Sequence, residues 1–301
     1  MCTPSEDSAG ARHVPVLVRE VSQFLAPPKA GIVVDLTIGQ GGHGLALGAQ
    51  LGPEGILVGI DLDQKALESA ATSLAGLQCK VILLMGNYAS IGQILRSAGL
   101  ECVDVMLADL GFCSAQVFDQ DMGLSFQTDA PLDMRFDRSI RTTAADIVNN
   151  ADEQALADLI YQYGQDRLAR RIARLIVERR QIKPITTTKQ LAEIVCSAYR
   201  GRSRIHPATR TFQALRIAVN HELDNLKALL EQAPSLLRKG GRIGVISFHS
   251  LEDRIVKYDF KAKAEAGLYK ILTTKPVRPG PTEVSINRRA RSAKLRVAER
   301  I

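Results

Sequence analysis

The sequence predicts an α/β fold with a mostly parallel sheet that is interrupted by a helical domain. In the first third of the chain, short apolar, β-branched runs alternate with helical segments, which is typical of βαβ units. A further apolar run appears only after residue 241, and the interval 110–241 is far longer than one crossover connection needs. The 301 residues, 46% of them hydrophobic, are enough to bury a sizeable core and exclude wholesale disorder.

Five apolar runs predict buried strands. They are Gly31–Gly39, Gly55–Asp61, Lys80–Met85, Val103–Asp109 and Arg242–Phe248. A helix is expected to open at Gln40–Gln50, after the first strand, and another is expected near 64–75. Leu236–Gly241 predicts a helix that ends in glycine caps before the last strand.

The long interval contains helical patterns. These are Glu153–Tyr163, Asp166–Arg180, Thr188–Ala198 and a long segment from Pro207 into the 230s, which has proline in its first turn. We therefore expect a helical domain over 115–205, inserted into a discontinuous α/β domain formed by 1–114 and 206–301. The last helix of the interval is expected to return the chain to the sheet.

Several protein classes are excluded by composition. No stretch approaches the ~20 apolar residues of a membrane span, and the first ten residues lack the basic and apolar regions of a secretory signal. The cysteines at 2, 79, 102, 113 and 196 form no C-x-x-C pair, so neither a structural zinc site nor a disulfide framework is expected. We expect a cytoplasmic protein with reduced thiols, no metal and no membrane partner.

The positive charge is concentrated near the C-terminus. Residues 270–301 hold nine Lys and Arg against two Glu, which equals the whole net charge of +7. A basic terminus favours a polyanionic partner, with nucleic acid preferred to membrane because no apolar helix face accompanies it. A solubilising tail is the alternative. Further arginines predict a positive surface on the insertion; they are Arg167, Arg170, Arg171 and Arg174, on one helix face, and Arg200, Arg202, Arg204 and Arg210.

A glycine-rich loop follows the first strand. Gly39, Gly41 and Gly44 satisfy G-x-G-x-x-G, and Asp61 ends the next strand about 20 residues further on, as the fingerprint requires. Such a loop lets backbone amides approach a ligand, while the strand-end carboxylate accepts hydrogen bonds from ribose hydroxyls. The pattern alone fits a nicotinamide dinucleotide as well as S-adenosylmethionine.

Three residues favour S-adenosylmethionine or complete its site. Asp35, four residues before Gly39, would attract a sulfonium cofactor and repel a pyrophosphate, although it could also cap a turn. Asp109 ends the fourth strand at the sheet edge where ligands bind in open α/β folds, or caps the next turn. Tyr88, after the third strand, could stack on an adenine or simply pack at the rim.

Longer segments carry a resemblance to a known family. They include His13–Leu17, Asp35–His43, Gly123–Phe126, Pro131–Arg135, Ala169–Arg174, His206–Asn220, Ile246–Arg254, Lys275–Pro279 and Arg289–Arg296. Together they resemble the RsmH (MraW) family of bacterial small-subunit ribosomal RNA methyltransferases over nearly the whole chain. Departures occur at Cys113 and Ala115, where the family commonly has Ser and Pro, and in Tyr163–Leu168.

The resemblance implies a Rossmann-like class I S-adenosylmethionine-dependent methyltransferase sheet with an inserted helical domain. It implies methyl transfer to N4 of a decoding-centre cytidine of 16S rRNA, within the small ribosomal subunit. It also implies cofactor contacts at Gly41, Gly42, His43, Asp61, Tyr88, Asp109 and Gln116. Four of these contacts, Gly41, Gly42, Asp61 and Asp109, are also indicated by the residue patterns alone. The patterns indicate two more cofactor contacts, Asp35 and Gly39.

Cytosine N4 is a weak nucleophile, so the site must hold the amine in line with the methyl group and accept its proton. Asp109 is the first candidate acceptor, although it could serve only the cofactor. His249, just past the fifth strand, is the second, with a structural histidine as the alternative. We expect the insertion and the C-terminal segment to flank an RNA groove. A nicotinamide-dependent oxidoreductase and a non-catalytic RNA-binding protein remain the rival classes.

Overall fold

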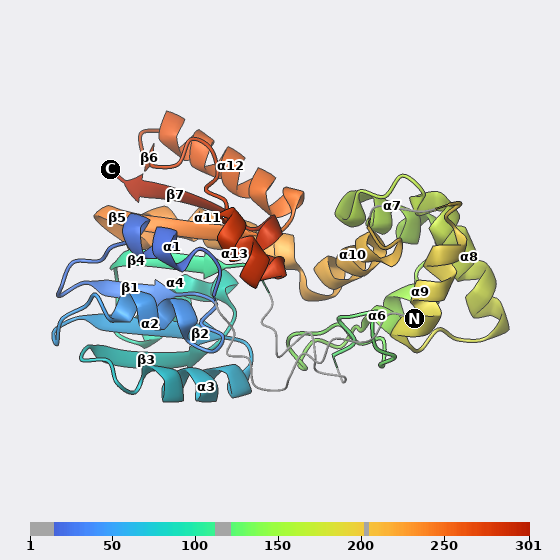
Figure 1. Ribbon diagram of the computed structural model, residues 1–301, viewed down its shortest axis with the longest axis horizontal. Coiled ribbons are helices and arrows are strands. Elements are labelled where there is room, and N and C mark those ends of the chain that lie inside the picture. Colours follow the sequence, from blue (N-terminus) through green and yellow to red (C-terminus); the bar gives the residue numbers. More distant parts are fainter. Residues whose placement is uncertain (1–14, 112–121, 202–204) are drawn as a thin grey trace.

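The sheet has the strand order that doubly wound α/β proteins use. The computed structural model describes residues 15–111, 122–201 and 205–301, and these residues form a seven-stranded sheet in the order β3-β2-β1-β4-β5-β7-β6 (Figure 1). The strands are β1 (Ile32–Asp35), β2 (Ile56–Asp61), β3 (Lys80–Met85), β4 (Val103–Asp109), β5 (Leu237–Ser247), β6 (Tyr269–Ile271) and β7 (Lys294–Arg300). Strands β1 to β5 are parallel, whereas β7 is antiparallel to both of its neighbours. The predicted Rossmann-like sheet is confirmed.

Helices cover both faces of this sheet. One hydrophobic cluster joins the sheet to α4 (Ile91–Ser97), α11 (Glu222–Leu236) and α12 (Ser250–Glu265). A second cluster, on the other face, includes α1 (Val18–Phe24), α2 (Gly42–Gly48) and α3 (Gln64–Leu74). Strand residues such as Val33 and Val34 are fully buried and belong to different clusters, as alternation along a strand requires.

The helical part of the chain has a hydrophobic cluster of its own and lies beside the sheet (Figure 1). Its helices are α6 (Ala144–Asn150), α7 (Glu153–Gly164), α8 (Ala169–Ile182), α9 (Thr188–Ser197) and α10 (Ala208–Asn220). Shorter elements complete the described chain: η1 (Tyr88–Ser90), α13 (Pro281–Ile286) and η2 (Arg288–Ser292). The predicted helical insertion is therefore present.

The long helical segment after Pro207 is broken in two. His221 adopts a left-handed conformation with φ +52°, so α10 ends at Asn220 and α11 begins at Glu222. Helix α10 packs with the helices of the insertion, since Phe212, Leu215 and Val219 belong to their cluster. The expected division into 1–114 with 206–301 and 115–205 remains a prediction; the packing adds that α10, expected on the sheet side of this boundary, contacts the helical side.

One expectation about the C-terminal part was wrong in detail. The predicted helix end at Leu236–Gly241 is instead the start of β5, because α11 stops at Leu236. Between Val103 and Val105 of β4 the partner residues in β5 jump from Leu237 to Arg242, so the residues between them bulge. Gly240 supplies the positive φ, +79°, that this bulge needs.

The basic C-terminal segment is part of the sheet. Arg296 lies in β7, is 7% exposed and donates from Nε to Asp253 Oδ1 at 2.7 Å. Lys294 Nζ donates to the other oxygen of Asp253 at 3.1 Å, and Arg300 donates to the carbonyls of Pro234 and Leu268. Part of the charge therefore stabilises the fold, whereas Lys270, Lys275, Arg278, Arg288 and Arg291 are exposed.

Two further observations concern membrane spans and cysteines. No helix within the described ranges is long and apolar enough to cross a membrane. Cys79, Cys102 and Cys196 are free thiols.

Candidate active site

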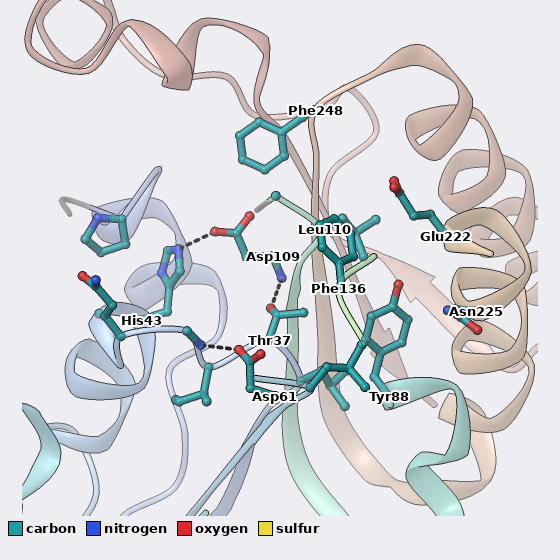
Figure 2. A pocket seen from close by; sticks show the side chains of 18 of the residues that line it. Thr37, His43, Asp61, Tyr88, Asp109, Leu110, Phe136, Glu222, Asn225 and Phe248 are labelled. Atoms are coloured by element: carbon teal, nitrogen blue, oxygen red, sulfur yellow. Dashed lines mark hydrogen bonds and ion pairs between the residues drawn. The ribbon is translucent and has the colours of Figure 1, made fainter. Parts of the chain in front are cut away.

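A pocket opens at the carboxyl ends of the parallel strands, where β1 and β4 meet and the strand order reverses. This is the edge at which ligands bind in doubly wound sheets. Its wall includes the ends of β1, β2, β3 and β4, the glycine loop and the junction with the helical part (Figure 2). The lining residues used below are Pro15, Thr37, Gly39, Gly42, His43, Asp61, Tyr88, Asp109, Phe136, Asn220, Glu222, Asn225, Phe248, Glu252 and Asn287.

The glycine loop has the geometry that its sequence predicts. Gly39 and Gly41 have φ values of +50° and +85°, which glycine adopts at little cost, and Gly41 precedes the first turn of α2. A Cβ at Gly39 would meet only the Thr37 carbonyl oxygen, at 3.9 Å, so this part of the loop faces open space. Gly39 and Gly42 line the pocket as expected, whereas Gly41 is not among its lining residues.

Asp61 fixes the loop from the end of β2. Its Oδ2 accepts a hydrogen bond from the Gly39 amide at 2.9 Å, and its Oδ1 accepts one from the Asp63 amide at 3.0 Å. Burial raises the pKa of Asp61, and these two hydrogen bonds act in the opposite direction. The carboxylate therefore orients the loop while it lines the pocket, with lone pairs left for ribose hydroxyls.

Asp109 and His43 face each other across the pocket floor (Figure 2). His43 Nε2 lies 3.5 Å from Asp109 Oδ2. Burial by itself lowers the pKa of His43, but the Asp109 and Asp35 carboxylates outweigh it, and the pKa is raised above its usual value. The backbone amide of Asp109 donates to Thr37 Oγ1 at 2.8 Å, which anchors the end of β4 to the end of β1.

Two polar groups at this floor are buried and have no hydrogen-bond partner within the described part of the chain. They are Asp109 Oδ1 and the imidazole nitrogens of His43. Buried polar atoms without partners are rare in folded proteins and mark places where a ligand or water completes the bonding. The floor thus offers an acceptor at Asp109 and a second polar group at His43.

Asp35 lies beneath the pocket and not in its wall. It is 1% exposed, and its Oδ1 accepts from the Thr37 amide at 3.2 Å. Burial raises the pKa of Asp35 to about 6. The lining residues of this turn are Leu36, Thr37 and Ile38, so the expected cofactor contact of Asp35 is not direct in this arrangement; its carboxylate acts on the pocket through Thr37 and through the charge of His43.

The far wall of the pocket comes mostly from residues that the sequence analysis did not name as contacts. Phe136, Asn220, Glu222, Asn225 and Phe248 line it together with the predicted Tyr88. The interrupted helical pattern at Asn220 and His221 was a usable indication, because these residue types tolerate a left-handed backbone. Nothing in the spacing could bring Phe136 to Asn220, which is 84 residues away.

His249 is not among the lining residues and has a structural role at the start of α12. Its Nδ1 accepts from the Glu252 amide at 3.4 Å, and Glu252 Oε2 accepts from the Phe248 and His249 amides at 2.8 and 3.2 Å. This reciprocal arrangement is a capping box. Because Nδ1 is the acceptor, the neutral ring carries its proton on Nε2, which faces Glu252 Oε1 at 3.1 Å.

The same hydrogen bonds argue against a metal at this cluster. One ligand atom from each of Glu222, His249 and Glu252 lies within 4.8 Å of the others. A protonated Nε2 cannot be a metal ligand. Arg216 already binds both oxygens of Glu222, at 2.7 and 2.9 Å, which leaves that carboxylate committed to an ion pair.

The positive surface of the insertion is partly as expected. Arg170 and Arg174 are exposed on α8, but the helix begins at Ala169, so Arg167 lies in the turn before it. Arg200 and Arg210 are also exposed. Gln116, Cys113 and Ala115, together with Arg202 and Arg204, lie outside the described residues.

Comparisons with known proteins are consistent along the chain. The model of the MraW methylase family matches residues 10–301. A relative named ribosomal RNA small subunit methyltransferase H from Coprothermobacter proteolyticus is 46% identical over 285 residues, covering 95% of this chain and 95% of its own. Relatives of the same name from Acidobacterium capsulatum and Persephonella marina are each 47% identical; each alignment covers 96% of this chain and 98% or 99% of the relative.

Proposed function

This chain belongs to the MraW methylase family, and from that membership and its pocket we propose that it methylates the RNA of the small ribosomal subunit. The methyl donor in this proposal is S-adenosylmethionine, and the acceptor is N4 of a decoding-centre cytidine in 16S rRNA. The reaction would take place in the cytoplasm, on the assembled subunit. One observation carries the proposal: at the floor of a pocket beside a glycine loop, Asp109 Oδ1 is a buried carboxylate oxygen without a hydrogen-bond partner among the described residues.

The residues present fit the cofactor. The loop backbone at Gly39 faces open space, which a bulky bound group can enter. Asp61 offers carboxylate lone pairs at the end of β2, suited to ribose hydroxyls, and Tyr88 offers a ring at the end of β3, suited to an adenine. Gly42 and His43 complete this side of the pocket, and Gln116 remains a predicted contact. When bound, S-adenosylmethionine supplies a methyl group activated by its positively charged sulfur.

Asp109 is the proposed proton acceptor for the cytosine amine. Its amide is fixed by Thr37, and one carboxylate oxygen faces His43. The other oxygen has no partner in the described part of the chain, so it can accept an N–H of the substrate. As the methyl carbon bonds to N4, its bond to sulfur would break, and an N–H proton of the amine would pass to Asp109. The electron pair of that N–H bond then stays on the nitrogen as its lone pair. His249, the second candidate, is 10% exposed and bonded as a helix cap, so we assign it the positioning of α12.

A direct assay tests this reaction. Purified small subunits from a strain that lacks this modification are incubated with the protein and methyl-labelled S-adenosylmethionine, and the digested rRNA is analysed by mass spectrometry. We expect label in N4-methylcytidine. Label in another nucleoside would reject the N4 assignment, and cofactor binding without any transfer would reject catalysis by this site.

Exposed arginines of the helical part are proposed to hold the RNA backbone. Arg170, Arg174, Arg200 and Arg210 form a positive surface to which phosphates bind without sequence preference. Deleting 286–301 would test the basic terminus but would also remove β7 from the sheet, so charge reversal is the sharper experiment. Arg170→Glu with Arg174→Glu should weaken subunit binding and flatten its salt dependence. Lys227→Glu, on α11 outside the helical part, is the matched control and should change neither.

A further inference from the structure

We propose that Phe136 stacks on the target nucleobase and that Asn220 is the positioning residue that holds Phe136 in the pocket. This inference rests on the proposed function and deepens it, since it assigns the substrate side of the same site. It begins with a backbone outlier. Met134, two residues before Phe136, is fully buried and has φ +67°, a conformation that a non-glycine residue keeps only where surrounding contacts enforce it.

Asn220 supplies those contacts. Its Oδ1 accepts from the Phe136 amide at 2.8 Å, and its Nδ2 donates to the Met134 carbonyl at 2.7 Å. The second Nδ2 hydrogen bonds the Arg216 carbonyl at 2.9 Å, one turn back in α10. The side chain is 6% exposed, so both of its donors and its acceptor are used in a dry environment, where such bonds are strongest.

Asn220 and its hydrogen bonds to Phe136 and Met134, here called the clamp, lie where the helical part joins the sheet. Asn220 is the last residue of α10, His221 has a left-handed backbone, and α11 follows at Glu222. Asn225, in the first turn or two of α11, donates to the Asn220 carbonyl at 3.0 Å. The loop that carries Phe136 is thereby tied to the helix that packs on the sheet, so the helical part contributes a fixed aromatic ring to the pocket.

Phe136 lies on the substrate side of the proposed acceptor. Figure 2 shows His43 on one side of Asp109 and Phe136 on the other, with Phe248 beyond the carboxylate. The Phe248 ring packs on Gly111, where a Cβ would come within 2.7 Å of Cε2. The glycine loop and His43 therefore lie on one side of Asp109, and the rings of Phe136 and Phe248 lie away from them.

Aromatic faces are what a displaced base requires. A base that leaves its stack to reach an active site loses its stacking partners, and enzymes replace them with aromatic or apolar side chains. Such stacking depends little on base identity, so Phe136 would hold the ring while Asp109 recognises the amine. The chemical class that fits beside Asp109 is accordingly a planar, uncharged nucleobase with an exocyclic amine.

The test separates an aromatic contact from simple packing. Phe136→Leu keeps apolar volume and removes the flat ring face, whereas Phe136→Tyr keeps the face. Methylation of small subunits is measured under single-turnover conditions, with enzyme in excess of subunits but below saturation. Phe136→Leu should lower this rate about 5- to 100-fold, whereas Phe136→Tyr should keep most of the original rate. Affinity for S-adenosylhomocysteine, measured by calorimetry, should stay unchanged in both. Phe126→Leu, an aromatic residue packed on His206 and Phe212 away from the pocket, is the matched control.

Asn149 provides a matched control for the clamp. Its Oδ1 accepts from the Ile185 amide at 2.9 Å, and its Nδ2 donates to the Ile185 and Ala145 carbonyls at 2.7 and 2.8 Å, away from the pocket. Asn220→Ala and Asn149→Ala remove the same kinds of bonds and should both lower the melting temperature. Only Asn220→Ala should raise the subunit concentration needed for half-maximal rate.

Each outcome bears on a different claim. If the unaltered protein transfers no methyl group, the proposed function fails. If it does transfer and Phe136→Leu methylates subunits as well as the unaltered protein, the stacking role fails while the function stands. If Phe136→Leu weakens S-adenosylhomocysteine binding as much as it slows methyl transfer, Phe136 contacts the cofactor and its assignment to the target base is wrong. Equal kinetic effects of Asn220→Ala and Asn149→Ala would reduce Asn220 to a structural role.

Discussion

The Nε2 of His43 lies 3.5 Å from Oδ2 of Asp109, and both residues line the pocket. The raised pKa of His43 favours a positive charge next to the carboxylate. The pair therefore links the glycine-loop helix to the end of β4, the strand that carries the proposed acceptor.

Replacing Asp109 by Asn should abolish most of the methyl transfer. Asn has the same shape but cannot accept a proton, so the rate should fall about 10²- to 10⁴-fold, whereas S-adenosylhomocysteine should bind within a few-fold of its original affinity. Single-turnover transfer and calorimetry measure the two quantities. Asp104→Asn is the control at the opposite end of the same strand, where the carboxylate binds the Ile32 amide and Arg238. It should lower stability and leave the transfer rate intact; a slow Asp104→Asn variant would contradict this assignment.

Asp61→Asn should weaken cofactor binding rather than slow the methyl-transfer step. The amide group can accept from only one of Gly39 and Asp63 and points an N–H at the other, so the glycine loop is displaced. We expect at least a tenfold loss of S-adenosylhomocysteine affinity, from hydrogen bonds to a charged group. Asp63→Asn is the matched control, because Asn also caps the start of α3. Unchanged affinity in Asp61→Asn would remove Asp61 from the cofactor site.

Asp35→Asn should stabilise the protein in a pH-dependent way. The folded protein holds the Asp35 proton up to about pH 6, whereas the unfolded chain releases it near 3.8. Stability of the unaltered protein therefore falls as the pH rises through this window, and the deficit stays constant above it. Relative to the unaltered protein, Asp35→Asn should gain up to about 3 kcal/mol of unfolding free energy between pH 4 and 6.

Urea denaturation at several pH values measures this gain. His43 lowers the pKa of Asp35 in the folded protein. In a His43→Gln background the upper limit of this pH window should therefore move to higher pH. A gain that is the same at pH 4 and pH 7 would show that the charge of Asp35 is not its source.

Asp253→Asn should destabilise the sheet. Burial alone would raise the pKa of Asp253, but hydrogen bonds from Arg296 and Lys294 hold it below its usual value. The ionised carboxylate therefore stabilises the fold above about pH 4, and this contribution is lost as the pH falls further. We expect a loss of about 1–3 kcal/mol at pH 7, shrinking in acid, measured by urea denaturation. Asp224→Asn breaks an exposed pair with Lys227 and should cost less than about 1 kcal/mol; comparable losses would be evidence against the Asp253 pair.

The sequence predicted the strands and the glycine loop of the pocket well, because their determinants are local. β3 and β4 match their apolar runs residue for residue, and the loop geometry follows from Gly39 and Gly41, which need positive φ values. Asp61 and Asp109 end neighbouring strands, so a parallel sheet places both at one edge. The cofactor contact of Asp35 stays a prediction. Its side chain is buried and is not among the lining residues, a placement that strand spacing does not reveal.

The substrate side depends on contacts that are distant in sequence. Phe136 reaches the pocket through Asn220, and no local pattern encodes that pairing. The role of Arg296 was hidden for a similar reason. In the sequence it belongs to a basic segment that favours a nucleic-acid partner, but its charge is neutralised by Asp253, which lies 43 residues earlier on another element. Charge that is balanced by a distant partner is not visible as a pattern.

The position of β7 also links the pocket to the outer part of the sheet. This strand lies between β5 and β6, and β6 pairs with β7 alone among the described strands. On this side, β5 therefore has a neighbouring strand only while β7 is paired with it. The segment carrying Asn287, which lines the pocket, precedes η2 and β7 in the chain. Fraying of β7 would thus expose the edge of β5 and disturb one wall of the pocket at the same time.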